Sequence, residues 1–419
     1  TLTIDINIQK SLERELDNIV DMFSPDMALA IVMDPNNGEI LGMASRPDYD
    51  PNSYQKYQQD VLSRNLPIWA SYEPGSTFKI ITTSAAVEEG VVDLDKDHFY
   101  DSGSVNVDGS TLRCWKAGGH GAQTFLQVLQ NSCNPGFVKM GQLLGKETLF
   151  DYIDKFGFGS KTGVDLNGEG KGIIFDLDQV GNVELATTAF GQGVSVTPIQ
   201  QVTAVSAVVN GGTLYEPYIV KSISEKETGS IIQETKKKKV RQVISKKTSR
   251  IMRHALESVV AQGGGKSAYI EGYRIGGKTG TAQKVQNGVY LVGNYIMSFM
   301  AIVPSNDPEA VLYLAIDNPK NTALLSSYTT TPIARRILLD IIDALEIERQ
   351  DGGLEKDLEW TDIPTHKVPN VVGMSVDDAK KKLDKFTIEY SGGGSTVAAQ
   401  SPTSGEKLEE GGTVRLLLE

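Results

Sequence analysis

The sequence has few cysteines and no long apolar run, and both shortages restrict what the chain can be. Among 419 residues there are 2 cysteines, so a disulfide framework does not hold this fold together. No stretch approaches the roughly 18 consecutive apolar residues that a membrane-spanning helix needs, and no signal peptide is present. The chain begins at Thr1 rather than at an initiator Met, so the lack of an anchor says nothing about the whole protein.

Basic charge is also scarce. Lys and Arg number 41 against 53 Asp and Glu, a formal net charge of −12, and this excess of acid argues against a nucleic-acid partner. One local basic run, Lys236–Lys239 followed by Arg241, is an exception. We interpret it as the solvated end of a hairpin, with a contact to an anionic cell-wall polymer or lipid as the alternative.

The first third of the chain combines helices with one early hairpin. Apolar residues recur with helical spacing over 5–23, and a second helical stretch starts near Ser76 and runs to Gly90. Between them, two apolar runs at 27–34 and 39–45 flank an Asn-Gly turn, which is typical of a β-hairpin. From about residue 91 to 220 helical spacing and loops dominate.

Strand-like runs return late in the sequence, at 274–285, 295–304 and 310–317. An amphipathic helix is predicted over 332–345. Strands at both ends with helices between them predict an α+β fold, in which one sheet joins distant segments of the chain.

A charged, Gly-containing stretch then indicates a linker. We predict three parts: a catalytic domain over 1–348, a linker over 349–363 and a small domain over 364–419. The last part is about 55 residues long, which is near the lower limit for an independent core. In it, Ser375 is placed to cap a short helix.

The first of three short chemical patterns is Ser76-Thr77-Phe78-Lys79, which follows Pro74-Gly75 and so stands at a helix start. Residues three apart lie on one helix face, so Lys79 can take the proton of Ser76 and make its hydroxyl a nucleophile. A lysine can do this only if burial or a second cation lowers its pKa. Alone the pattern is weak, because a capping serine and an ordinary surface lysine give the same letters.

The second pattern is Ser132-Cys133-Asn134, inside the predicted helical region. A hydroxyl and an amide two residues apart can relay a proton and bind a substrate amide. We expect Ser132 and Asn134 to face the first pair, with a helix cap as the alternative interpretation.

The third pattern is Lys278-Thr279-Gly280-Thr281, in a strand-like run. Lys278 is expected to supply the second cation, and the small Thr279 and Gly280 allow a substrate backbone to lie beside an edge strand. Backbone N–H groups of Thr281 and Ser76 are expected to form the oxyanion hole.

Another Lys-Thr-Gly stands at 161–163, among Gly-rich loop residues. Because a motif needs its structural context, we assign the role to the copy at 278, which lies in a predicted strand.

At this point the chain resembles a known family. Ser-x-x-Lys, Ser-x-Asn and Lys-Thr-Gly, in this order, mark penicillin-binding proteins and serine β-lactamases. Three further stretches resemble the class B penicillin-binding proteins: residues 2–5, 190–200 and 278–283. Residues 364–419 resemble a PASTA module, and a single such module resembles the sporulation-specific class B proteins of spore-forming bacteria.

This resemblance implies a transpeptidase fold, with an antiparallel sheet and a helical subdomain, and a D-Ala-D-Ala transpeptidase or carboxypeptidase activity. Ser76 would be acylated by a peptidoglycan stem pentapeptide or by a β-lactam, and Lys278 and Thr279 would hold the substrate carboxylate. It also implies the extracytoplasmic face of the bacterial membrane, an anchor absent from this chain, and a membrane glycosyltransferase partner.

Two relatives of the same fold remain as alternatives. A β-lactamase shares all three patterns, but no Glu-x-x-Leu-Asn that would activate water occurs between Asn134 and Lys278. A β-lactam sensor would need an attached signalling domain. A scaffold role with dispensable chemistry is the third alternative, and intact motifs disfavour it.

Both cysteines lie near the second pattern, together with other metal-ligating residue types. Asp101, Cys114, His120 and Cys133 are zinc ligand types, and four is the usual number for a structural site. We predict one structural zinc that braces the loop of Ser132 and Asn134 and is not needed for the chemistry. His98 or a water is the alternative to Asp101, and a Cys114–Cys133 disulfide or two buried thiols are the alternatives to zinc.

Overall fold

The computed structural model describes residues 1–286, 289–320, 326–357 and 365–419. The chain divides into two compact units, Thr1–Lys356 and Asp357–Glu419. The three parts predicted from the sequence, with their two boundaries, stay a prediction, and residues 358–363 of the expected linker lie outside the described residues. In the described part of the chain, no helix has both the length and the apolarity to cross a membrane.

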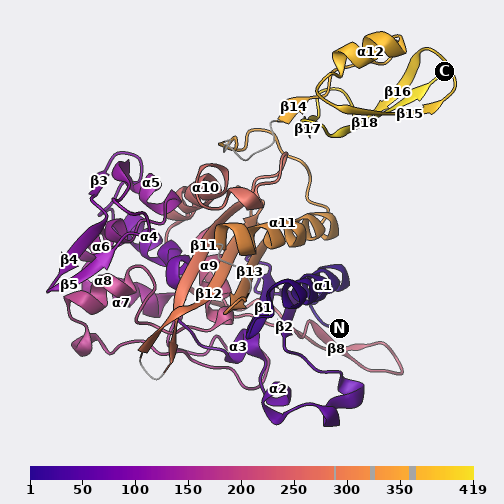
Figure 1. Cartoon of the computed structure of the whole chain (residues 1–419). Helices are drawn as coiled ribbons and strands as arrows, with labels where there is room; N and C mark the ends of the chain where they lie inside the picture. Colours follow the sequence, from indigo (N-terminus) through magenta and orange to yellow (C-terminus); the bar gives the residue numbers. More distant parts are fainter. Residues whose placement is uncertain (287–288, 321–325, 358–364) are drawn as a thin grey trace. The chain divides into compact units, whose positions relative to one another are not determined.

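A five-stranded sheet, counted over the described residues, forms the centre of the larger unit (Figure 1). Each strand runs antiparallel to its neighbours, and the pairing of β1 with β13 joins the start of the chain to a segment almost 300 residues later. The predicted α+β arrangement is therefore confirmed. In spatial order, the strands are β11 (Gly276–Gln286), β12 (Val289–Val303), β13 (Ala310–Asp317), β1 (Met27–Met33) and β2 (Ile40–Arg46).

Helices cover both faces of this sheet. On one face lie α1 (Ile6–Phe23) and α11 (Ser326–Ala344), and on the other lies α9 (Pro198–Val209), which packs in turn on α4 (Lys79–Glu88) and α10 (Lys246–Gln262) (Figure 1). Alternate residues of a strand point to opposite faces. In β13, Tyr313 therefore packs with the α9 side and Leu314 with the α1 side. Burial on both faces explains why β1 and β13 read as continuous apolar runs.

The remaining segments of the larger unit are short. The helices are α2 (Gln59–Ser63), α3 (Leu66–Trp69), α5 (Phe125–Gln130), α6 (Asn134–Leu144), α7 (Lys146–Lys155) and α8 (Asn182–Thr188), and the 3₁₀ turns are η1 (Pro51–Lys56), η2 (Gly75–Phe78), η3 (Leu177–Gln179) and η4 (Lys266–Ala268). Among the residues that the structure describes, short strands form four antiparallel pairs: β3 (His98–Asp101) with β6 (Gly121–Thr124), β4 (Ser104–Val107) with β5 (Ser110–Arg113), β7 (Thr213–Tyr215) with β10 (Lys239–Gln242), and β8 (Ser222–Ser224) with β9 (Ile231–Glu234).

Several boundaries differ from the sequence prediction. The strand β12 begins at Val289 rather than at residue 295. The last helix of the larger unit begins at Ser326 rather than at residue 332, so Pro332 lies inside it. Ser76 lies in the 3₁₀ turn η2, and the α-helix proper begins at Lys79. The hydroxyls of Ser326 in α11 and of Ser76 in η2 both lie close to the site described below.

The smaller unit has its own core. Ser375 caps the helix α12 (Val376–Lys382) by accepting a hydrogen bond from the Asp378 N–H at 3.2 Å, as predicted. The core consists of Val368, Val371, Ala379, Leu383, Val397, Val414 and Leu416. The elements are β14 (Thr365–Lys367), α12 (Val376–Lys382), β15 (Thr387–Gly392), β16 (Val397–Ser401), β17 (Lys407–Glu409) and β18 (Thr413–Leu418), with β15, β18 and β16 in one sheet and β14 paired with β17.

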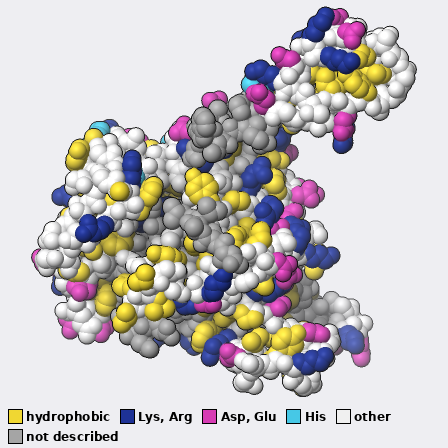
Figure 2. All heavy atoms as spheres, viewed as in Figure 1, with side chains coloured by type: hydrophobic (Ala, Val, Ile, Leu, Met, Phe, Trp, Pro, Cys, Tyr) yellow, Lys and Arg dark blue, Asp and Glu magenta, His cyan; other side chains and the backbone are white. Residues whose placement is uncertain are grey.

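Charged side chains of both signs are interspersed over the face of the larger unit that Figure 2 shows. The basic run 236–239 is exposed and links β9 to β10, and Lys238 pairs with Glu216 at 2.6 Å. Because β9 pairs with β8 and β10 pairs with β7, the run is not the end of a hairpin as predicted, although its exposure agrees with a solvated segment.

Candidate active site

The serine of the first motif lies on a turn that is fixed from two sides. Gly75 has a φ of 56°, and its N–H donates to the Gly191 carbonyl at 2.9 Å. The Thr77 hydroxyl lies 2.9 Å from both the Pro74 carbonyl and the Gln201 side-chain oxygen. These contacts hold the turn rigidly, and the hydroxyl of Ser76, which is half-buried, stands on it.

Lys79, one turn further on, is fully buried and reaches the second motif. Its side-chain nitrogen lies 2.8 Å from the Ser132 carbonyl oxygen, 3.1 Å from the Ser132 hydroxyl oxygen and 2.7 Å from the Asn134 side-chain oxygen. The ring of Phe137 lies 5.0 Å from the same nitrogen. The structure therefore brings together the first two motifs, as predicted, through the lysine.

The surroundings of Lys79 lower its pKa, which a lysine needs if it is to act as a general base. Burial is the larger cause, and the positive charge of Lys278 the second, that hold the pKa of Lys79 well below its ordinary value. A neutral amine keeps a lone pair and can accept a proton from a hydroxyl.

Ser132 has a φ of 54°, a left-handed conformation that is rare for a residue other than glycine. Strain of this kind persists only where the surroundings impose it, and it gathers at functional sites. Here the conformation places both the carbonyl oxygen and the hydroxyl oxygen of Ser132 beside the amine of Lys79. Asn134 starts α6 and donates its amide to the Arg113 carbonyl at 3.3 Å.

The third motif lies on β11, which is the edge strand of the sheet next to β12. Lys278 is fully buried, and burial lowers its pKa to about 7. A Cβ on Gly280 would lie 2.3 Å from the Ser298 hydroxyl and 3.0 Å from a Thr77 methyl, so this position requires glycine. The strand consequently packs directly against the turn of Ser76.

The other Lys-Thr-Gly, at 161–163, lies in a loop. Its Thr162 hydroxyl and backbone N–H both donate to the Glu169 carboxylate at 2.6 Å. These residues are engaged in holding a loop and do not lie in a strand, which supports the choice of the copy at 278.

Glu73, three residues before the serine, is a support that the sequence analysis missed. Its carboxylate accepts from the Gly193 N–H at 2.8 Å and from the Tyr290 hydroxyl at 3.0 Å. It thus ties the start of the nucleophile turn to the 190–193 loop and to β12. The contact joins residues 217 positions apart, so no local pattern could have indicated it.

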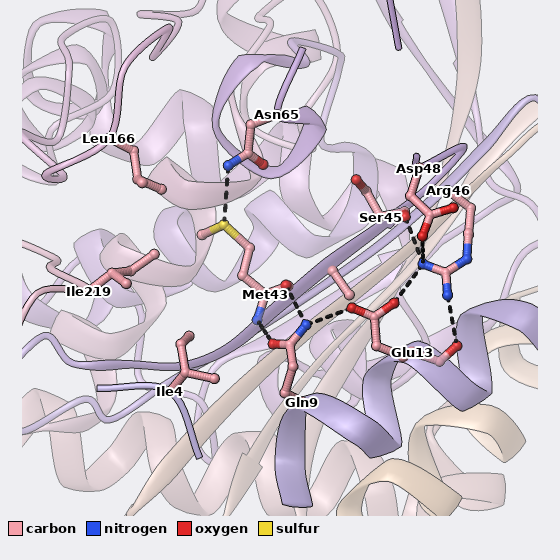
Figure 3. A pocket seen from close by; sticks show the side chains of 11 residues that line it. Ile4, Gln9, Glu13, Met43, Ser45, Arg46, Asp48, Asn65, Leu166 and Ile219 are labelled. Atoms are coloured by element: carbon pink, nitrogen blue, oxygen red, sulfur yellow. Dashed lines mark hydrogen bonds and ion pairs between the residues drawn. The ribbon is translucent and has the colours of Figure 1, made fainter. Parts of the chain in front are cut away.

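A separate pocket lies on the other side of the larger unit, between the start of the chain, α1 and β2 (Figure 3). Arg46 lines this pocket, and the Arg46 guanidinium pairs with Glu13 at 2.7 Å, Asp17 at 2.8 Å and Asp48 at 3.3 Å. Residues of the three motifs do not line this pocket, so we attribute to it a role in holding α1 on the sheet.

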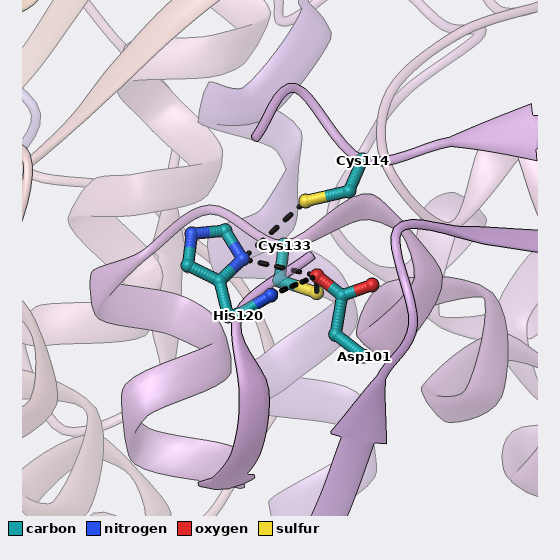
Figure 4. A group of neighbouring side chains, drawn as sticks. All are labelled: Asp101, Cys114, His120 and Cys133. Atoms are coloured by element: carbon teal, nitrogen blue, oxygen red, sulfur yellow. Dashed lines mark hydrogen bonds and ion pairs between the residues drawn. The ribbon is translucent and has the colours of Figure 1, made fainter. Parts of the chain in front are cut away.

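The four predicted metal ligands do meet, at the start of α6 (Figure 4). Their ligand atoms all lie within 4.8 Å of one another. The Asp101 carboxylate is the centre of the group: it lies 3.0 Å from the His120 Nδ1 and 3.3 Å from the Cys133 Sγ. The Cys114 Sγ lies 3.3 Å from the same His120 nitrogen.

Both thiols of the cluster are free, so the structure does not contain the Cys114–Cys133 disulfide that was an alternative to zinc. Burial raises the pKa of Cys114, and it raises that of Cys133 to about 12. Burial acts the same way on Asp101, but hydrogen bonds from Cys114, the Gly103 N–H and His120 outweigh it and hold the Asp101 pKa below its ordinary range. His98, the alternative ligand, is exposed and lies outside the cluster.

An antiparallel sheet and a helical subdomain that bring Ser-x-x-Lys, Ser-x-Asn and Lys-Thr-Gly together define the class of penicillin-binding proteins and serine β-lactamases. Residues 28–339 match the family described as the penicillin binding protein transpeptidase domain. The chain belongs to this family. Residues 366–419 match the PASTA domain, as predicted for the smaller unit.

Known proteins agree with this assignment. The chain is 55% identical over 417 residues to stage V sporulation protein D of Bacillus subtilis, and 33% identical over 333 residues to the penicillin-binding protein PbpB of Mycolicibacterium smegmatis. These matches cover 100% and 77% of this chain, but only 65% and 51% of the relatives. The chain thus spans about two thirds or less of the length of these proteins.

Solved structures confirm the predicted fold. The crystal structure of penicillin binding protein 3 from Mycobacterium tuberculosis, complexed with aztreonam, has a TM-score of 0.77 and 29% identity. The match covers 85% of this chain and 81% of the chain in the crystal structure. The transpeptidase domain of penicillin-binding protein 3 from Burkholderia pseudomallei has a TM-score of 0.72 and 27% identity, over 84% of this chain and 98% of that one.

Proposed function

We propose that the protein is a serine D,D-transpeptidase that cross-links peptidoglycan stem peptides through an acyl-enzyme on Ser76. The observation that carries the proposal is the buried Lys79, whose amine bonds to Ser132 and Asn134 and stands one turn after Ser76. β-Lactams would acylate the same hydroxyl.

In the first half-reaction, the Ser76 oxygen attacks the carbonyl between the two terminal D-Ala residues of a pentapeptide. The hydroxyl proton passes to the neutral amine of Lys79. The N–H groups of Ser76 and Thr281 stabilise the negative oxygen of the tetrahedral intermediate, and Lys278 and Thr279 hold the terminal carboxylate. The C–N bond then breaks, and a proton delivered through Lys79 and Ser132 allows the terminal D-Ala to leave as an amine.

In the second half-reaction, an amine of a neighbouring stem attacks the ester on Ser76. A peptide bond forms between the stems as Lys79, again neutral, takes a proton from the attacking amine, and the Ser76 oxygen leaves with that proton. If water attacks in place of the amine, the same steps give carboxypeptidase activity.

A synthetic pentapeptide ending in D-Ala-D-Ala tests this function. The protein should release free D-Ala, and, with an added amine acceptor, should form the joined peptide. Ser76→Ala should abolish both products, while Ser63→Ala, a change at the end of α2 outside the three motifs, should leave both in place. Release of D-Ala by the Ser76→Ala variant would overturn the proposal.

We propose further that Asp101, Cys114, His120 and Cys133 hold one structural zinc. Zinc binds sulfur at about 2.3 Å and nitrogen or oxygen at about 2.0–2.2 Å, which requires ligand atoms as close together as those described here. The donor set also fits, since two thiolates, a carboxylate and an imidazole are zinc ligand types. The ion would replace the protons of two buried thiols and fasten the start of α6, where Asn134 lies.

Elemental analysis and chelation test the zinc. A closed four-ligand site should retain about one equivalent after purification without chelator. Chelation should then lower the melting temperature, because a ligand of the folded form adds to stability, and Cys133→Ser should mimic it. Less than roughly a tenth of an equivalent, together with a Cys114–Cys133 crosslink seen by mass, would end the metal proposal.

Location and partners belong to the whole protein. By its resemblance to class B penicillin-binding proteins, we propose that this chain acts at the extracytoplasmic face of the membrane, with a membrane glycosyltransferase as its partner. Its 55% identity to a protein named for sporulation supports a role in spore formation.

A further inference from the structure

A hydroxyl from the opposite face of the sheet reaches the substrate-binding strand. Ser326 is the first residue of α11 and is 1% exposed. Its hydroxyl donates a short hydrogen bond to the Gly280 carbonyl, and its oxygen lies 2.6 Å from the Thr281 hydroxyl oxygen. Thr281 itself is exposed, so Ser326 contacts the third motif from behind.

The direction of these two hydrogen bonds follows from counting protons. A carbonyl oxygen can only accept, so the single proton of Ser326 is directed to Gly280. The bond between Ser326 and Thr281 therefore needs the proton of Thr281. The three groups form one chain, in which Thr281 donates to Ser326 and Ser326 donates to Gly280, and such chains strengthen each other.

The consequence concerns negative ligands. A threonine hydroxyl has one proton, and here it is directed away from the cleft toward Ser326. The oxygen of Thr281 then offers only lone pairs to a ligand beside β11, and lone pairs do not bind a carboxylate. Thr281 can donate to a carboxylate only after the bond to Ser326 is broken.

The position of Ser326 leaves it little freedom to release Thr281. Its side chain is buried, so its hydroxyl has no bulk water to turn to if it leaves Gly280. A buried hydroxyl that loses a partner also carries the cost of an unsatisfied polar group. The arrangement with Thr281 as donor to Ser326 is therefore the resting one.

We propose that Ser326 is a specificity-determining residue that withholds the Thr281 hydroxyl from carboxylate-bearing substrates and β-lactams. The inference rests on the proposed function, in which Lys278 and Thr279 hold the substrate carboxylate, because Thr281 lies two residues further along the same face of β11. Removing the Ser326 hydroxyl gives Thr281 its proton back, and the protein should then react faster with an anionic β-lactam.

The test compares second-order rates of acylation by benzylpenicillin. Ser326→Ala should react about fivefold faster than the unchanged protein, the rate equivalent of about 1 kcal/mol for a neutral hydrogen bond that no longer has to be broken. Ser327→Ala, which removes the next hydroxyl in α11, should react at the unchanged rate. Ser326→Gly gives a second reading if the alanine variant melts at a much lower temperature.

A double-mutant cycle separates this mechanism from a general effect on α11. In a Thr281→Val background, Ser326→Ala should bring no gain, because no hydroxyl is left to release. A rate of Ser326→Ala equal to or below that of the unchanged protein, or a gain that persists in the Thr281→Val background, would overturn the inference. Failure of the unchanged protein to be acylated at all would instead reject the proposed function.

Discussion

Gly191 offers a sharp test of how the nucleophile turn is held. It belongs to the loop 190–193 and has a φ of 86°. A Cβ at this position would lie 2.1 Å from the Gly75 carbonyl oxygen and 2.8 Å from the Phe78 Cβ. An alanine here therefore cannot be accommodated without moving the backbone that carries Ser76.

The expected loss of folding stability has two parts. An alanine in the left-handed region costs roughly 1–2 kcal/mol, and overpacking of a well-packed site adds roughly 1–3 kcal/mol. To clear the Gly75 oxygen, the turn must move by roughly 1 Å, and a displacement of that size at reacting groups can cost about 100-fold in rate. Gly191→Ala should thus lower both the unfolding midpoint and the rate of acylation.

Gly168→Ala is the matched control. Gly168 has the same φ of 86°, but a Cβ there would meet nothing within 4 Å. It should lose only the backbone cost in the melting temperature and keep its rate of acylation by a fluorescent penicillin. If both variants react at the same rate, the loop 190–193 does not hold the Ser76 turn, and this part of the reasoning is wrong.

Three further results are expected. A chain ending at Lys356 should be acylated at the full-length rate, because all three motifs lie in the first unit; a tenfold fall with the fold intact would reject this. The acyl-enzyme should be long-lived, whereas hydrolysis of penicillin at many turnovers per second would indicate a β-lactamase. The pKa of Lys278 is about 7 in the folded protein, against 10.5 in the unfolded chain. Between these pH values this lysine binds a proton mainly in the unfolded state, so the free energy of unfolding rises with pH across this window. Lys278→Met should reduce the rise in melting temperature from pH 7 to 9, and an unchanged rise would contradict the lowered pKa.

The sequence predicts the frame of the site because its motifs are local. Ser76 and Lys79 are three residues apart, and the edge position of β11 follows from its place among the late strands. A strand such as β13 is detectable because burial on both faces makes it a continuous apolar run.

The supports of the site could not be predicted, because they join distant residues. Ser326 and Thr281 are 45 residues apart, and Glu73 and Tyr290 are 217 apart. Strands of four residues, such as β3 and β6, are too short to show a period. The helix start at Ser326 was missed because Pro332 is an expected first-turn residue, whereas here it lies within the helix.

The acylated residue is tested most directly by the mass of the protein after reaction with penicillin, followed by peptide mapping. We predict one covalent adduct per chain, on the peptide that contains Ser76, and none in the Ser76→Ala variant. An adduct on Ser132, or an unchanged mass in properly folded protein, would contradict the assignment of Ser76 as the nucleophile.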